Sequence, residues 1–278
     1  MKRLTKKYRL LILFLCMLLP LMGCSVKKTE GLRVYFPSLG QGDCTVFVTP
    51  GGKTVAVDAG PAGSSDDLHA FLLRQKIKTV DLLILTHAHA DHVGGAAAIF
   101  DFCTVKNVWY TPEKNGSSSE DELLDAIRKS GARLSDAAVG ISGTFDGLSL
   151  SVILRPTDAS DPNGNSAIVR AVYGGTSFLL MADAGADAEK QLLAEKPELL
   201  RADLLKVGHH GSDSGCTGDF LGAVSPSWAV VCCGIANVYA HPHRRCLEAL
   251  EKAGCRVFLT SNGTQEFRSD GQKVYRIE

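Results

Sequence analysis

Apolar residues along the chain fall into short runs that glycine, proline and polar residues separate. Runs rich in β-branched residues predict strands over 32–36, 45–49 and 54–57, with a hairpin turn at 50–52. The continuous apolar run over 80–85 is typical of a strand buried on both faces. The same pattern predicts further strands over 148–154, 167–173, 177–181, 203–207 and 227–233.

Other stretches have the three-to-four-residue spacing of an amphipathic helix. Residues 66–78 place Leu68, Phe71, Leu72 and Ile77 on one side, with acids at the start. Further helices are predicted over 120–130, 186–195 and 244–253. Strands and helices are mixed, and no linker is long enough to demand a second domain. The pattern therefore predicts an α/β-type layered fold around one large core.

The N-terminal end has a different pattern. Residues 1–9 carry five basic side chains and no acid, and an apolar run over 10–22 follows, too short for a comfortable membrane span. Leu21-Met22-Gly23-Cys24 resembles a bacterial lipobox, which implies lipidation of Cys24. We therefore expect a lipoprotein signal peptide over 1–23, a tether over 24–31 and a folded domain over 32–278, anchored to the bacterial membrane outside the cytoplasm. The alternative is an uncleaved N-terminal anchor with an incidental cysteine.

Charge and cysteine content narrow the function. The chain has 30 basic and 30 acidic residues, so without the five basic residues of the signal the net charge is −5. This argues against a broad basic surface for nucleic acid, although a local groove near metal ions stays open. Seven cysteines follow Cys24 without a CxxC pair. We expect them to be small buried apolar residues, with one or two disulfides as the alternative.

The segment 86–95 carries four candidate metal ligands directly after the buried run. In an extended segment residues i and i+2 point the same way, so His87 and His89 can bind one metal ion together. If the chain then turns into a helix, Asp91 and His92 point toward a second position. Imidazole and carboxylate groups suit Zn²⁺ or a similar cation. The alternative is a polar loop with chance histidines, but the spacing favours the metal site.

Three further predicted strands end in residues of the same kind. Asp58 follows 54–57, Asp183 follows 177–181, and the pair His209 and His210 follows 203–207. One such residue after a strand is usually a turn residue. Four strands that each end in Asp or His indicate a common site, because α/β sites gather at strand ends.

These motifs resemble those of the metallo-β-lactamase-fold hydrolases, whose signature is the HxHxDH segment with its Gly-Gly. The order of the segments 40–43, 57–60, 165–169, 183–184, 209–212 and 237–243 is similar to the hydrolase domain of DNA-uptake competence proteins, and secreted phosphorylcholine esterases look related. The resemblance covers about residues 32–278. It implies an αββα four-layer sandwich with metal ions at the edge between layers.

The resemblance also implies roles for individual residues. His87 and His89 would bind the first metal ion, and Asp183 would bridge to the second. The second ion would be held by Asp91, His92 and one of His209 and His210, with His210 favoured. Asp91 and Asp183 would be the catalytic carboxylates. Asp58 would orient a ligand histidine. We expect four further residues to support the ligands or to contact the substrate: Asp43, Asn165, Ser212 and His241. For His241, a position on the surface away from the site is an equal alternative.

The implied activity is a metal-dependent hydrolysis by a hydroxide that two divalent ions activate, Zn²⁺ first and Mn²⁺ as the alternative. Phosphodiesters are the expected substrates, either nucleic acid or a phosphorylated cell-surface compound. Two alternatives stay open: a lactam or lactone hydrolase, and a non-catalytic lipoprotein that binds metal or ligand. The sequence departs from the competence pattern at 37–39, at Ala182 and at His89. These differences affect the expected substrate more than the expected metal site.

Overall fold

The computed structural model describes residues 31–113, 117–156 and 162–278. The predicted signal peptide, Cys24 and residues 24–30 of the predicted tether lie outside the described residues. Within the described part, no helix is both long and apolar enough to cross a membrane.

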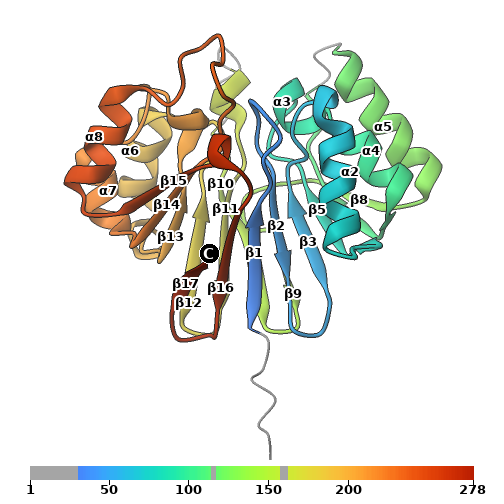
Figure 1. Ribbon diagram of the computed structural model, residues 1–278, viewed down its shortest axis with the longest axis horizontal. Coiled ribbons are helices and arrows are strands. Elements are labelled where there is room, and N and C mark those ends of the chain that lie inside the picture. Colours follow the sequence, from blue (N-terminus) through green and yellow to red (C-terminus); the bar gives the residue numbers. More distant parts are fainter. Residues whose placement is uncertain (1–30, 114–116, 157–161) are drawn as a thin grey trace, which may run out of the picture. The chain divides into compact units, whose positions relative to one another are not determined.

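Two β-sheets packed face to face form the centre of the described domain (Figure 1). The first has the strand order β17-β16-β1-β2-β3-β5-β7-β8, and the second has the order β15-β14-β13-β12-β11-β10-β9. The first sheet comprises β1 (Leu32–Phe36), β2 (Thr45–Val48), β3 (Thr54–Val57), β5 (Leu82–Ile84), β7 (Asn107–Trp109), β8 (Arg133–Ser135), β16 (Gln265–Ser269) and β17 (Val274–Ile277). The second comprises β9 (Ser142–Phe145), β10 (Leu148–Leu154), β11 (Ile168–Tyr173), β12 (Thr176–Leu180), β13 (Leu204–Lys206), β14 (Trp228–Val231) and β15 (Arg256–Leu259).

Helices cover the outer face of each sheet (Figure 1). The first sheet is covered by α2 (Ser65–Arg74), α3 (Ala90–Val93), α4 (Ala96–Phe102) and α5 (Ser118–Ser130). The second is covered by α6 (Ala186–Glu195), α7 (Gly218–Val224) and α8 (Arg244–Lys252). Three apolar clusters fill the spaces between these layers, one between the sheets and one under each set of helices. The predicted αββα sandwich is confirmed.

The predicted strand over 80–85 is divided in the structure. Val80 belongs to β4 (Thr79–Val80), which pairs with β6 (Thr104–Val105), whereas Leu82–Ile84 forms β5 in the large sheet. Asp81 lies between them, and its buried carboxylate accepts a hydrogen bond from the Thr54 backbone N–H (3.1 Å). The division follows from that one polar residue, because its carboxylate bonds to the neighbouring strand.

The chain between β5 and α4 is shaped by two glycines. A Cβ on Gly94 would lie 2.3 Å from the carbonyl oxygen of Ala90, and one on Gly95 would lie 2.2 Å from that of Ala59. The helical turn expected after His89 is therefore two helices, α3 and α4, which pack closely against the segment after β3. This packing brings His92 to Asp58, since the Ala59 N–H donates to the His92 carbonyl (2.8 Å).

Candidate metal centre

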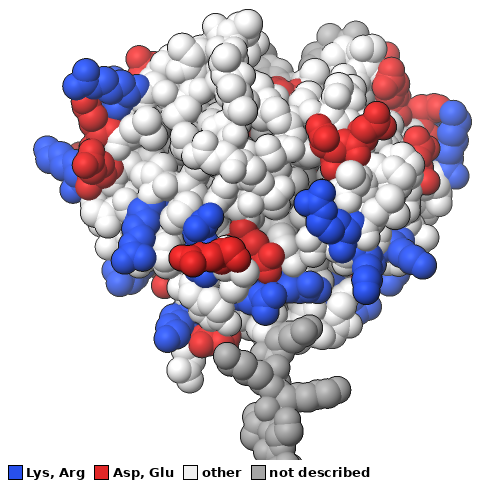
Figure 2. All heavy atoms as spheres, viewed as in Figure 1, with Lys and Arg blue, Asp and Glu red and all other residues white. Residues whose placement is uncertain are grey.

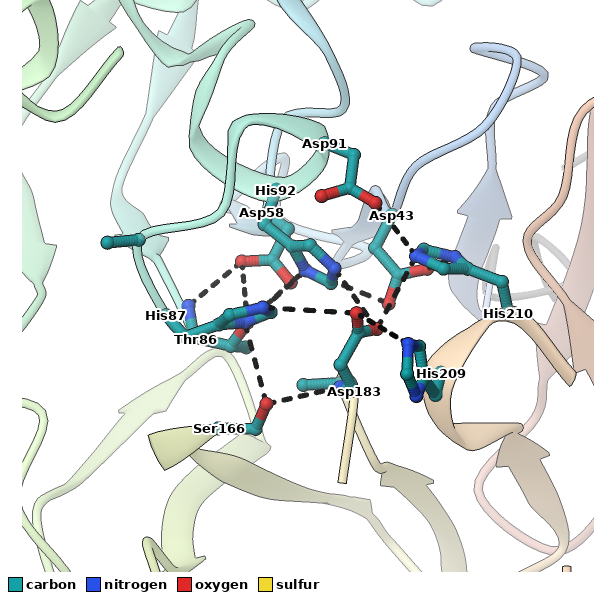
Figure 3. A network of polar contacts seen from close by, with 12 residues as sticks. Asp43, Asp58, Thr86, His87, Asp91, His92, Ser166, Asp183, His209 and His210 are labelled. Carbon is teal, nitrogen blue, oxygen red and sulfur yellow. Dashed lines mark hydrogen bonds and ion pairs between the residues drawn. The ribbon is translucent and has the colours of Figure 1, made fainter. Parts of the chain in front are cut away.

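Four strand ends place the candidate ligands at one edge of the sandwich, between the two sheets. β3 leads into Asp58 and β5 into His87, both from the first sheet. β12 leads into Asp183 and β13 into His209 and His210, from the second. Figure 3 shows these side chains pointing toward one another. The sequence prediction of a common site at strand ends agrees with this arrangement.

His92 is held between two carboxylates. Its Nδ1 lies 2.8 Å from Asp58 Oδ2, and its Nε2 lies 3.1 Å from Asp183 Oδ1. Asp58 also accepts hydrogen bonds from Thr86, through the backbone N–H (2.9 Å) and the hydroxyl (2.9 Å). Asp58 is therefore fixed in place, and its hydrogen bond orients the ring of His92, in agreement with the role that the family resemblance implied.

His87 and His89 lie beside this group. The ring centroids of His87 and His89 are 4.7 Å apart, and His87 Nε2 is 3.9 Å from Asp183 Oδ2. His87 is fully buried, whereas His89 is half-buried at the pocket. His87, His89 and Asp183 each offer one ligand atom within a mutual distance of 4.8 Å.

A second group shares Asp183. Asp91 Oδ2 lies 3.0 Å from His210 Nε2, which in turn lies 3.5 Å from Asp183 Oδ1. With His92 these residues offer four ligand atoms within 4.8 Å of one another. His209 points to the same carboxylate from farther away, with Nε2 4.0 Å from Asp183 Oδ2. Of the two histidines, His210 is the one in the four-residue group.

The chemistry of the donor atoms fits a cation. His87 Nε2, His92 Nε2 and Asp183 Oδ1 are buried and have no hydrogen-bond partner among the residues that the structure describes. If the His92 Nδ1 proton is donated to Asp58, the Nε2 lone pair faces a carboxylate oxygen, and two acceptors at 3.1 Å require a positive charge between them. Burial lowers the pKa of His92, but the carboxylates of Asp183 and Asp58 outweigh it and hold this pKa well above its ordinary value. The residues present therefore fit divalent metal ions.

The pocket over this cluster has a volume of about 220 Å³. Its lining residues are His89, Asp91, Asn163, Asp183, His209, His210, Tyr239 and His241. His241 thus faces the site, and burial together with the nearby His209 and His210 lowers its pKa to about 4. Tyr239 stacks on His241, with ring centroids 5.7 Å apart.

The other expected residues are placed as follows. Asp43 is buried, with Oδ1 3.3 Å from His210 Nδ1. Ser212 fixes the turn after His210, since its hydroxyl accepts a hydrogen bond from the Ser214 backbone N–H (3.2 Å). Asn163 lines the pocket, whereas Asn165, at the end of the same 3-10 helix (Pro162–Asn165), is partly buried and is not one of the lining residues.

Sequence reasoning missed three residues. Tyr239 lies in a loop and Asn163 in a short 3-10 helix, where the chain gives no periodic signal. Lys206, in contrast, had a visible signal: it is the one charged residue in the apolar run Leu204–Val207, and its side chain is only 2% exposed. A buried lysine is almost always paired with an acidic group, so a lysine inside a predicted buried strand indicates a nearby carboxylate.

The αββα fold, with groups of histidine and aspartate side chains gathered at one edge, defines a class of metal-binding protein. Residues 37–234 match the family model described as the Metallo-beta-lactamase superfamily, and the chain belongs to that superfamily.

Similar proteins agree with this assignment. ComE operon protein 3 of Bacillus subtilis (strain 168) is 31% identical over 200 residues, 71% of this chain and 26% of that protein. The crystal structure of YhfI, a metallo-beta-lactamase fold protein from Bacillus subtilis, has a TM-score of 0.58 at 13% identity, over 85% of this chain and 100% of YhfI. A diphosphatase from the PhnP family has a TM-score of 0.51 at 15% identity, over 85% and 97%. The chain thus spans about a quarter of the length of this curated relative. Competence protein ComA of Neisseria gonorrhoeae is 28% identical over 232 residues, 82% of this chain and 31% of that protein, so the predicted similarity to competence proteins is confirmed.

Proposed function

We propose that this protein is a metal-dependent hydrolase with two divalent ions, Zn²⁺ first and Mn²⁺ as the alternative, and that phosphodiesters are its substrates. The observation that carries the proposal is the position of Asp183, whose carboxylate belongs to both groups of ligand atoms. A carboxylate shared in this way would contribute to the binding of both ions, as in two-metal hydrolytic sites. When bound, the ions supply Lewis acidity and an activated water for attack on the substrate.

The proposal assigns each residue to a metal ion, to the support of a ligand or to the substrate. His87, His89 and Asp183 are assigned to one ion, and Asp91, His92, His210 and Asp183 to the other. Asp58 keeps the Nδ1 proton of His92 in place, which leaves Nε2 free to coordinate. The more exposed His209 and His241 border the pocket, where they can donate hydrogen bonds to a substrate oxygen.

The pocket supports a small phosphodiester substrate. Every lining residue is a histidine, aspartate, asparagine or tyrosine, so an anionic group is attracted through the bound ions rather than through lysine or arginine. A diphosphatase among the proteins of similar fold supports a phosphoryl substrate. Nucleic acid and a phosphorylated cell-surface compound both contain this bond. We further propose that Cys24 anchors the protein outside the cytoplasm.

The test combines metal analysis with a substrate screen on the protein without residues 1–24. Elemental analysis should find about two transition-metal ions per chain, and the loaded protein should hydrolyse bis(p-nitrophenyl) phosphate. The double variant His87→Ala/His89→Ala should lose metal and activity, while His69→Ala should retain both, because His69 stacks on Phe102 away from the site. A metal-loaded protein that cleaves lactones but no phosphodiester would contradict the substrate assignment, and one without any turnover would favour a binding lipoprotein.

A further inference from the structure

A buried lysine lies directly behind the candidate ligands. Lys206 ends β13, and its side chain is 2% exposed. Its ammonium group forms an ion pair with Asp43 Oδ2 and donates a hydrogen bond to the carbonyl oxygen of Ala182 (2.9 Å). Each of these two partners belongs to a segment that leads into the site.

The first partner connects Lys206 to Asp91 and His210. The backbone N–H of Asp43 donates to the carbonyl oxygen of Asp91 (3.0 Å), and Asp43 Oδ1 lies 3.3 Å from His210 Nδ1. The loop before Asp43 is tightly fitted as well, since a Cβ on Gly42 would lie 2.4 Å from the Asp91 carbonyl oxygen. Asp43 therefore fixes the backbone at Asp91 directly and lies beside the ring of His210, whose Nδ1 donates to the carbonyl oxygen of Cys232 (3.0 Å).

The second partner connects Lys206 to Asp183. Ala182 has a φ of +48°, a conformation that costs a non-glycine residue free energy and persists only where contacts hold it. Lys206 binds the carbonyl oxygen of the peptide between Ala182 and Asp183, and the N–H of that same peptide donates to Ser166 Oγ (3.2 Å). The peptide is thus held from both sides, which fixes the direction of the shared carboxylate.

We infer that Lys206 is a positioning residue, which keeps Asp91, Asp183 and His210 at the spacing that two metal ions require. This inference rests on the metal-dependent function proposed above. The positive charge of Lys206 does not itself favour metal ions nearby, so Lys206 can help metal binding only by positioning the ligands. The negative charge of Asp43 offsets the charge of Lys206. With neutral imidazoles, Asp43, Asp58, Asp91 and Asp183 together with Lys206 carry a net charge of −3.

The decisive variant is Lys206→Met/Asp43→Asn, because it removes the ion pair and leaves the net charge of the site at −3. We expect Zn²⁺ affinity, measured by competition with a chromogenic chelator, to fall at least tenfold, in line with the 10–100-fold effect of groups that support ligands. The melting temperature of the metal-free protein should change much less than that of the loaded protein. Equal lowering of both melting temperatures with unchanged affinity would show a merely structural ion pair and overturn the inference.

The matched control is Lys106→Met. Lys106 also pairs with a buried carboxylate, Asp81 (2.8 Å), but its side chain is half exposed and outside the site, so Zn²⁺ affinity should not change.

If the double variant does not fold, Lys206→Met alone answers the question. It makes the site more negative by one charge, which by electrostatics tightens cation binding. Weaker Zn²⁺ binding in spite of this supports positioning, and equal or tighter binding overturns it. A wild-type protein that binds no metal would instead refute the proposed function itself, so the two failures are distinguishable.

Discussion

Four residues at the ends of the central strands have left-handed backbone conformations. Asp58, Ala182, His209 and His210 have φ values of 60°, 48°, 46° and 52°. Such conformations cost roughly 1–3 kcal/mol each in non-glycine residues and are found where function requires them. Here they turn the chain sharply at the end of each strand, so that neighbouring residues such as Asp183 and His210 point into the gap between the sheets.

Asp183→Asn tests the shared carboxylate. The amide keeps the size of the side chain but removes the anion that both groups of ligands use. We expect metal affinity to fall by at least about 100-fold, the upper end of the effect known for supporting groups, and turnover to fall with it. Melting of the metal-free protein should stay cooperative, because β12 is buried among apolar residues. His69→Ala is the control, and metal retention by Asp183→Asn would assign the bridge to another residue.

The pH dependence of stability should differ between metal-free and loaded protein. The pKa of His92 is held above its ordinary value, so the protonated ring stabilises the metal-free fold below about pH 6.5, and this contribution is lost as pH rises through the raised pKa. Metal ions need the unprotonated ring, so their binding strengthens over the same range. The difference in melting temperature between loaded and chelator-treated protein should therefore widen from pH 6 to pH 9. A constant difference would contradict this account of His92.

The ligands were predictable from the sequence because they are chemically conspicuous and stand at strand ends. His87, His92 and Asp183 needed only residue type, spacing and the preceding apolar run. Pocket residues that the chain brings in from loops, such as Tyr239, were not predictable, since loop conformation depends on tertiary contacts. Asn163 lines the pocket from the same 3-10 helix that ends at Asn165, and a role of Asn165 in supporting the ligands stays a prediction.

At the scale of elements, α3 and α4 are positioned by close backbone contacts at the two glycines between them. Gly94→Ala would place a methyl group 2.3 Å from the Ala90 carbonyl oxygen and 2.6 Å from the Ala62 nitrogen. We expect destabilisation by about 1–3 kcal/mol, as for other overpacking substitutions, together with weaker metal binding because His92 moves with α3. Thermal melting and chelator competition would measure the two effects.

Gly222→Ala provides the control. Gly222 lies inside α7, and no described residue beyond its chain neighbours and the backbone of its own helix lies within 4 Å of a Cβ added there. Alanine should stabilise this helix by roughly 0.4–1 kcal/mol and leave metal affinity unchanged. If Gly94→Ala behaved like Gly222→Ala, close packing at Gly94 would not position the site.

Two buried thiols connect α8 to the segment that follows His210. Cys216 Sγ and Cys246 Sγ lie 2.7 Å apart. We expect oxidised glutathione to convert them to a disulfide, with both thiol hydrogens passing to the two glutathione molecules released. Closing this 30-residue loop should stabilise the fold by up to roughly 3–4 kcal/mol, seen as a higher melting temperature that reductant reverses. Cys216→Ser should show neither the loss of two hydrogens by mass spectrometry nor the shift, and an unlinked wild-type pair would contradict the prediction.

Strand and helix positions followed from apolar spacing wherever the element was buried in the regular way. The helix over 186–195 has the predicted bounds, and β10 coincides with its predicted run. The prediction of one strand over 80–85 was wrong, because the chain on the two sides of the buried polar residue Asp81 pairs with different strands. Average hydrophobicity does not show this effect. The order of strands within the two sheets was not predicted, since periodicity carries no information on pairing partners.

At the scale of the whole molecule, the apolar sandwich and the metal site are stabilised by separate interactions. Three apolar clusters hold the layers together, and the ligands project from the edge without contributing to these clusters. The metal-free domain should therefore stay folded, with bound ions adding stability by mass action.

Charged side chains in the view of Figure 2 lie mostly on the lower part and the sides, and few lie on the upper middle surface. Near the pocket, Ile235, Val238 and Tyr239 are exposed apolar residues.

The last prediction concerns the location of this domain. If Cys24 carries a lipid, the protein expressed in a bacterium should fractionate with membranes, label with a radioactive or clickable fatty acid, and be released into the soluble fraction by Cys24→Ala. Cys44→Ala is the matched control, because Cys44 is buried inside the domain and inaccessible to lipidation. Two lipid chains give stable anchoring, whereas an uncleaved N-terminal segment would also hold the protein on the membrane without lipid. Membrane association that persists in Cys24→Ala, with no label in the wild type, would therefore support the uncleaved anchor and rule out the lipoprotein.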